Sequence, residues 1–167
     1  MQVYTVCRPE RVLKGISISG VLSVGEKGSP MATMMKIFLT EALFPTKKDV
    51  KKLIEKLCGE NSIVFTGNSD IMEHYTYLLK GFNNMAMGYH KVRRFTEEEV
   101  NVIRDKVEFL VGLEDPFEKL GGATAIQENH MRATFYENAG HGLNHERANA
   151  INAKMVEIFE SHLNAVK

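Results

Sequence analysis

Hydrophobic positions along the chain switch between the period of strands and the period of helices. Alternating or continuous apolar runs predict short strands at 3–7, 15–19 with a continuation at 21–24, 63–65, 85–94, 123–126 and 133–136. Helical spacing predicts helices that begin near Ser29, Thr46, Ser69, Thr96 and His145. Strands that alternate with helices are typical of an α/β domain, so we expect three layers around a small, mostly parallel sheet of about five strands.

Two helix starts carry the spacing of a capping box, in which side chain and backbone bond each other reciprocally. These are Thr46 with Asp49, and Thr96 with Glu99. The apolar stripe that follows Thr96 continues with helical spacing, so we expect this helix to reach Gly112.

An α+β fold is the alternative. Residues 1–24 resemble a hairpin, and 123–126 with 133–136 resemble another, joined through 128–130. Hairpins pair their strands antiparallel, which a mostly parallel sheet does not. Residues 63–65 are instead fully apolar, as in a strand covered on both faces.

Composition indicates one domain over residues 1–167, with 44% hydrophobic residues. The 21 basic and 21 acidic residues give a net charge of +0, which makes nucleic acid an unlikely partner. Without net charge, electrostatic repulsion does not oppose self-association, so a homodimer is possible. Cys7 and Cys58 do not make a disulfide framework. There is neither a signal-peptide pattern nor an apolar run of roughly 18 residues, so we expect a cytoplasmic, soluble protein without a cofactor or membrane contact.

Candidate chemistry lies in three polar loops, at 25–30, 66–70 and 138–146. Each follows a predicted strand and precedes a predicted helix. Ligand sites in parallel sheets form where such loops meet, at the carboxyl ends of the strands. We therefore expect the three loops to converge at one sheet edge.

The first two loops have the residue types of an anion site. The first offers a cation, close backbone approach and a helix start, and its candidate substrate-binding residues are Gly25, Lys27, Gly28 and Ser29, with Pro30 as the first helical residue. The second offers Asn68 for binding and Asp70 as a catalytic carboxylate. Ordinary turns and helix caps use the same residue types, which is the alternative for both loops.

The third loop holds His141 and His145, four residues apart. The glycines on either side of His141 favour a loop, and the residue order differs from the zincin pattern, so we expect no metal site. The ordinary pKa of histidine lies near neutrality, so His141 is the candidate general acid or base and His145 a candidate binding residue.

Residues 132–163, a strand followed by Asn138-Ala139-Gly140-His141-Gly142 and a final helix, resemble the C-terminal part of α/β-hydrolases. This resemblance implies that His141 takes the place of the triad histidine, which follows the last strand in that family. The match covers about a fifth of the chain. The nucleophile elbow Gly-x-Ser-x-Gly is absent, because Ser19 stands where residues 15–20 would need a glycine. The sequence alone therefore does not assign the family.

The leading hypothesis from sequence is a small cytosolic enzyme acting on a phosphate-bearing metabolite or nucleotide. In it Lys27 and Ser29 hold the anion, and His141 is the general acid or base. Asp70 either orients His141 or acts as a second carboxyl partner. The alternative is a non-catalytic, dimeric binding or inhibitor protein whose polar loops are only caps and turns.

Overall fold

A three-stranded parallel sheet forms the centre of the computed structural model, which describes residues 1–25, 32, 34, 36, 46–81 and 93–165. The strands are β1 (Gly15–Ile18), β2 (Val107–Gly112) and β3 (Arg132–Tyr136), in the order β1-β2-β3. Both neighbouring pairs are parallel. This confirms the α/β class with a parallel sheet. The antiparallel alternative is wrong, and the described residues form three strands where about five were expected.

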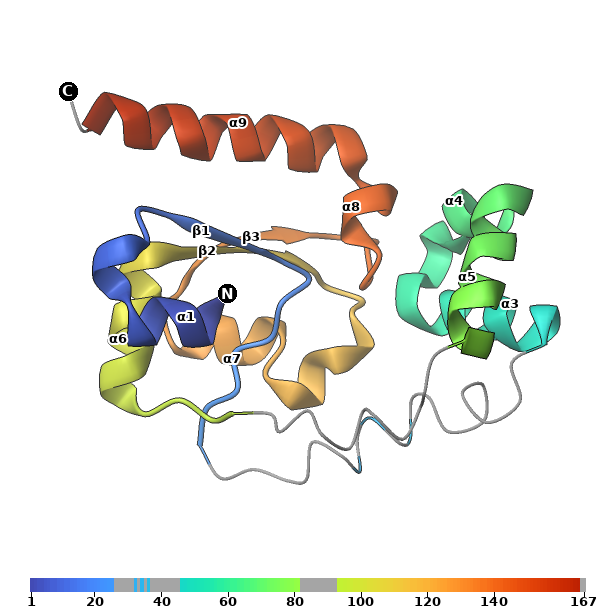
Figure 1. Cartoon of the computed structure of the whole chain (residues 1–167), viewed down its shortest axis with the longest axis horizontal. Helices are drawn as coiled ribbons and strands as arrows, with labels where there is room; N and C mark the ends of the chain where they lie inside the picture. Colours follow the sequence, from blue (N-terminus) through green and yellow to red (C-terminus); the bar gives the residue numbers. More distant parts are fainter. Residues whose placement is uncertain (26–31, 33, 35, 37–45, 82–92, 166–167) are drawn as a thin grey trace.

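Helices cover both faces of this sheet (Figure 1). Helix α9 (Ala148–Ala165) lies along one face, and α1 (Gln2–Cys7), α6 (Glu97–Lys106) and α7 (Ala123–Glu128) lie on the other. The central strand β2 is buried on both sides. Phe109 and Val111 pack in the cluster that includes Ile103 and Ile126, whereas Leu110 packs in the cluster that includes Ile151.

A second group of helices lies beside the sheet, close to the short helix α8 (Leu143–Glu146) (Figure 1). It consists of α3 (Lys47–Cys58), the 3₁₀ turn η2 (Gly59–Ser62), α4 (Ile63–Thr66) and α5 (Ser69–Gly81). Val50, Ile54, Cys58 and Phe65 form its own buried cluster.

The predicted helix starts at Thr46 and Thr96 are confirmed, and both have complete capping boxes. The Thr46 hydroxyl accepts the Asp49 N–H, and the Asp49 carboxylate accepts the Thr46 N–H. The hydroxyl of Thr46 also donates to this carboxylate, which lowers the pKa of Asp49. The predicted start at Ser69 is confirmed as well, and the last predicted helix forms as α8 followed by α9.

Three predicted strands are helices, so these predictions are wrong. Residues 3–7, 63–65 and 123–126 lie in α1, α4 and α7. Short apolar or β-branched runs favour strands locally, and tertiary packing overrides this preference. In α1 the buried Thr5 hydroxyl donates to the Met1 carbonyl one turn earlier, a bond that belongs to a helix.

After Thr96 the reverse holds: part of a predicted helix is a strand. The helix was expected to reach Gly112, but α6 ends at Lys106 and Val107 begins β2. The apolar positions 107 and 110 fit helical spacing, yet the run 109–111 is buried on both faces of a strand. The predicted hairpin of 123–126 with 133–136 is wrong too, because β3 pairs in parallel with β2.

Two predicted elements fall outside the described residues. The helix start at Ser29 and Pro30 is one, and most of the strand at 85–94 is the other. The predicted strand at 21–24 is reduced to one parallel bridge between Val24 and Phe95. The remaining 3₁₀ turns are η1 (Pro9–Arg11) and η4 (Pro116–Leu120). In the described part of the chain, no helix is both long and apolar enough to cross a membrane.

Candidate active site

A histidine–aspartate pair lies at the carboxyl ends of β2 and β3. Asp115 follows the last residue of β2 by three positions, and His141 follows the last residue of β3 by five. Because the strands are parallel, both loops leave the sheet at the same edge. The Nδ1 atom of His141 is 2.8 Å from Oδ2 of Asp115.

Backbone contacts hold the two loops together. The Leu113 N–H donates to the Tyr136 carbonyl at 3.0 Å, and the Glu114 N–H donates to the Ala139 carbonyl at 2.9 Å. These bonds extend the contact between β2 and β3 beyond the strands. They place Asp115 and His141 side by side without any long side chain having to reach across.

Asp115 is held on both of its oxygen atoms. Oδ1 accepts the N–H of Phe117 at 2.9 Å, where η4 begins, and Oδ2 faces His141. The side chain is only 6% exposed. An ionised carboxylate can only accept hydrogen bonds, so the proton of a neutral His141 lies on Nδ1 and Nε2 is the free acceptor.

The imidazole of His141 is itself 37% exposed, so its ring is accessible while its partner is buried. The ring packs edge-on against Phe117, with centroids 4.5 Å apart and planes at 75°. Its backbone N–H donates to the Leu57 carbonyl at 2.6 Å, at the end of α3. An accessible nitrogen on an oriented imidazole is the arrangement that proton transfer requires.

The other predicted residues of the second and third loops are placed differently. Asn68 caps α5 through hydrogen bonds from the Asp70 and Ile71 N–H groups, and the exposed Asp70 side chain bonds Ser69. The carboxylate that meets His141 is thus not Asp70. The loop at 66–70 follows a helix rather than a strand, so the convergence rule does not apply to it.

His145 lies in α8 with its ring 5.0 Å from that of Phe65, the residue just before this loop. This ring contact brings the start of the second loop, at 66–70, near the end of the third, at 138–146. The binding roles of Asn68 and His145 stay predictions.

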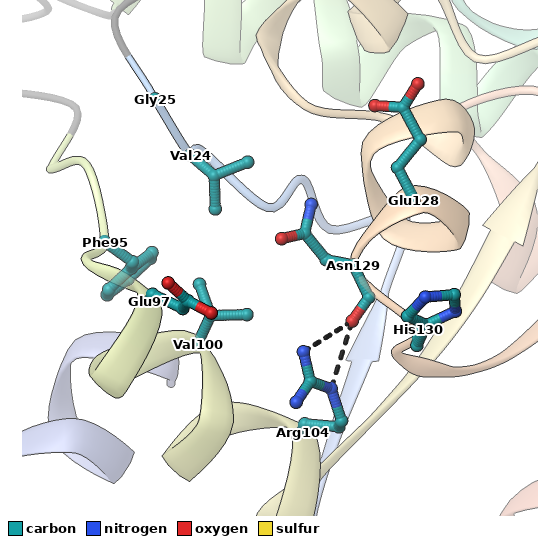
Figure 2. Close-up of a pocket in the computed structure, with 9 residues that line it drawn as sticks. All are labelled: Val24, Gly25, Phe95, Glu97, Val100, Arg104, Glu128, Asn129 and His130. Carbon is teal, nitrogen blue, oxygen red and sulfur yellow. Dashed lines mark hydrogen bonds between the residues drawn. The ribbon is translucent and has the colours of Figure 1, made fainter.

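Of the first loop, Gly25 is described, whereas Lys27, Gly28 and Ser29 lie outside the described residues. Gly25 lines a pocket of about 410 Å³ on the α6 and α7 side of the molecule (Figure 2). The pocket is lined by Val24, Gly25, Phe95, Glu97, Val100, Arg104, Glu128, Asn129 and His130. Arg104 donates from Nε and Nη2 to the Asn129 carbonyl, as Figure 2 shows. Neither Asp115 nor His141 is among the lining residues.

Within the described ranges, no three His, Cys, Asp or Glu side chains come together in a way that could hold a metal ion. His141 and His145 also have separate partners, Asp115 and Phe65.

The sequence analysis singled out His141 but not Asp115, the carboxylate that lies beside it. The signal was present, since Asp115 and Pro116 follow the apolar run 107–111 as a loop follows a buried strand. The helical spacing of positions 107 and 110 hides this strand, so the rule on carboxyl ends does not select Asp115 from the sequence.

The fold is similar to that of several solved hydrolases. A naproxen esterase (carboxylesterase) from Bacillus subtilis matches 95% of this chain with a TM-score of 0.71 and 17% identity, over 55% of its own length. A serine hydrolase from Cycloclasticus zankles matches 95% with a TM-score of 0.66 and 16% identity, over 59% of its length. The 2-hydroxy-6-oxo-6-phenylhexa-2,4-dienoate hydrolase of Rhodococcus sp. matches 93% with a TM-score of 0.53 and 14% identity, over 58% of its length.

These likenesses define the class of fold, which is α/β-hydrolase-like. The chain spans between 55% and 59% of the length of these three structures. No protein-family model matches the sequence, and no curated protein matches it. The resemblance seen at 132–163 thus extends, as fold, over nearly the whole chain.

The sequence-based hypothesis of an enzyme for a phosphate-bearing metabolite or nucleotide is wrong. The structural neighbours are named as a carboxylesterase, a serine hydrolase and a dienoate hydrolase. The hypothesis arose from an anion site expected at 25–30. Of that segment only Gly25 is described, and it lines a pocket whose lining does not include His141.

Proposed function

We propose that this chain carries the acid–base pair of a hydrolase that cleaves carboxylic esters or related acyl bonds. His141 is the general base and acid, and Asp115 orients it. The observation that carries the proposal is the 2.8 Å contact between Nδ1 of the accessible His141 and Oδ2 of the buried Asp115. Structural neighbours named as an esterase and a serine hydrolase support it.

The chemistry follows from the tautomer. With its proton on Nδ1, His141 takes a proton through Nε2 from an attacking oxygen as that oxygen bonds the acyl carbon. The imidazolium that forms is stabilised by the negative charge of Asp115. His141 then returns the proton to the leaving alcohol, so the pair ends as it began.

The attacking oxygen belongs either to water or to a hydroxyl group close to Nε2. Among the residues that the structure describes, no serine or threonine hydroxyl is hydrogen-bonded to His141. The two sources differ in their products, because a hydroxyl forms a covalent acyl intermediate and water does not. A fluorophosphonate probe followed by mass spectrometry separates them, since it labels only an activated hydroxyl.

The test is hydrolysis of p-nitrophenyl acetate and butyrate by the wild-type chain and by His141→Ala. General acid–base catalysis is worth about a hundredfold to ten-thousandfold, so a loss of that size is expected. His74→Ala is the matched control, because His74 is an exposed histidine of α5 away from Asp115. Equal hydrolysis by wild type and His141→Ala would rule the proposal out.

The domain organisation, oligomeric state, location and partners are predicted from composition alone. We propose that residues 1–167 act as one unit, with the α3 to α5 helices attached to the histidine loop through the His141–Leu57 hydrogen bond. A homodimer, a cytoplasmic location and the lack of a nucleic-acid partner stay predictions.

A further inference from the structure

Glu146, at the end of α8, is a buried carboxylate close to the candidate site. It is only 8% exposed, although glutamate is almost never fully buried unless it is paired. Oε2 accepts the Gly140 N–H at 2.9 Å. Oε1 has no hydrogen-bond partner, and neither oxygen forms an ion pair, among the described residues. Burying a carboxylate with so few partners costs free energy. Glu146 is therefore a candidate for a role beyond packing.

The hydrogen bond from the Gly140 N–H to Glu146 lies directly before the catalytic candidate in the chain. Gly140 directly precedes His141, so the carboxylate fixes the peptide plane from which the histidine begins. The next N–H, that of His141, donates to the Leu57 carbonyl at the end of α3. Two consecutive N–H groups, those of Gly140 and His141, are thus both hydrogen-bonded.

The loop also lies close against α3. A Cβ atom at Gly140 would be 2.9 Å from the Cα atom of Cys58. A Cβ atom at Gly142 would be 2.7 Å from the Cys58 sulfur and 2.6 Å from the ring of Phe65. Both glycines therefore allow a contact that no other residue could make without displacing its neighbours.

Cys58 connects this surface of α3 to Glu146. Its side chain is buried, and burial together with the nearby Glu146 carboxylate raises the pKa of the thiol to about 12. The thiol accordingly stays neutral at physiological pH. A second negative charge beside Glu146 is thereby avoided.

We propose that Glu146 is a positioning residue: its carboxylate holds the Gly140 amide and so keeps the His141 imidazole on Asp115. The inference rests on the proposed acid–base role of His141. Glu146 acts through the backbone, and the reacting atoms are left to His141. A displacement of about 1 Å in a catalytic group can cost about a hundredfold in rate, so one hydrogen bond at Gly140 can matter for catalysis.

The experiment compares Glu146→Ala with Glu146→Gln by NMR and by kinetics. The readouts are the far-downfield proton signal of the His141–Asp115 hydrogen bond and the titration of the His141 ring. Glu146→Ala should weaken or abolish the signal and shift the titration. It should also lower kcat about tenfold to a hundredfold with KM unchanged, as expected when only transition-state alignment is lost.

Glu146→Gln keeps an oxygen that can accept the Gly140 N–H, so it should restore the signal and most of kcat. Glu137→Ala is the matched control, because Glu137 is an exposed glutamate of the same loop, and it should change neither readout. If Glu146→Ala does not fold, Glu146→Asp replaces it, since the shorter side chain draws the carboxylate away from Gly140 and should cause the same loss.

Two results would overturn the inference. One is a Glu146→Ala protein that melts earlier but keeps the wild-type signal and titration, which would make Glu146 purely structural. The other is a Glu146→Gln protein as impaired as Glu146→Ala. Failure of the proposed function looks different: the wild-type chain would show the His141–Asp115 signal without hydrolysing esters, and the NMR comparison would still decide the role of Glu146.

Discussion

Gly112, the last residue of β2, lies so close to Ala139 that a Cβ atom at position 112 would be 2.6 Å from the Ala139 carbonyl carbon. This approach joins the loop that carries Asp115 to the loop that carries His141. The geometry of the pair therefore depends on a backbone contact as much as on the two side chains.

Substituting Gly112 by alanine should separate the two loops. The clash is with backbone, which cannot rotate away as a flexible side chain would, so we expect a loss of about 1–3 kcal/mol in the free energy of unfolding. Urea denaturation measures it. Gly81→Ala is the control, because a Cβ atom there would have no neighbour within 4 Å, and it should cost little or be slightly stabilising. Equal stabilities for the two variants would contradict the importance of this contact.

Asp115→Asn should reduce ester hydrolysis far more than stability. Asparagine keeps the shape of the side chain, but its NH₂ group can donate to Nδ1 and so favour the proton on Nε2, the wrong tautomer for a general base. In a serine protease the equivalent change lowers kcat by about ten-thousandfold, and we expect a loss approaching that size. The measurement is kcat for p-nitrophenyl acetate beside a urea melt. A variant that keeps wild-type kcat would remove Asp115 from the mechanism.

The parts of the fold that sequence predicts well are those with local causes. Thr46 and Thr96 begin helices because a hydroxyl and a carboxylate three residues apart satisfy two orphan N–H groups. The parts it misses depend on distant partners. Val107 could continue α6, and what makes it a strand residue is its pairing with Gly15 of β1. From Glu108 onward β2 pairs with β3 as well.

The candidate site divides in the same way. His141 stands out in the sequence because its glycine neighbours and its position after a strand are local features. Asp115 becomes visible only when β2 is known to be parallel to β3, because then both loops share one edge. Glu146 gives no sequence signal, since its importance comes from burial.

The capping box at Thr96 offers a quantitative test of local stability. Thr96→Ala removes the hydroxyl that accepts the Glu99 N–H, and losing such a cap costs about 1 kcal/mol. Thr96→Ser keeps the hydroxyl and should stay close to the wild type. Urea denaturation of the three proteins distinguishes them. If alanine and serine were equally stable, the box would contribute nothing to folding.

Metal removal should leave the protein unchanged. Acidic, histidine and cysteine side chains do not gather in threes among the described residues, and His141 already has Asp115 as its partner. We expect the melting temperature and the rate of ester hydrolysis to be the same before and after dialysis against EDTA. A fall of several degrees that zinc or another divalent ion reverses would show that a metal is bound.

Stability at alkaline pH should report on Cys58. Its pKa is raised from 9.0 to about 12 in the folded protein, because the buried thiolate would lie in an apolar region beside Glu146. The folded state thus holds a proton that the unfolded chain releases above pH 9. This contribution is complete below that pH and is lost as pH rises toward 12, at about 1.4 kcal/mol per pH unit.

Urea denaturation at a series of alkaline pH values tests this. Cys58→Ser removes the titrating group and should flatten the dependence, since a serine hydroxyl does not ionise in this range. Cys7→Ser is the matched control, because Cys7 is exposed, and its dependence should follow the wild type. Other groups also titrate here, including Tyr136, whose pKa burial raises, so the difference between the two variants carries the test. If the free energy of unfolding changed with pH equally in Cys58→Ser and Cys7→Ser, the Cys58 thiol would not be buried against Glu146. The close contact between Gly142 and the Cys58 sulfur would then be in doubt.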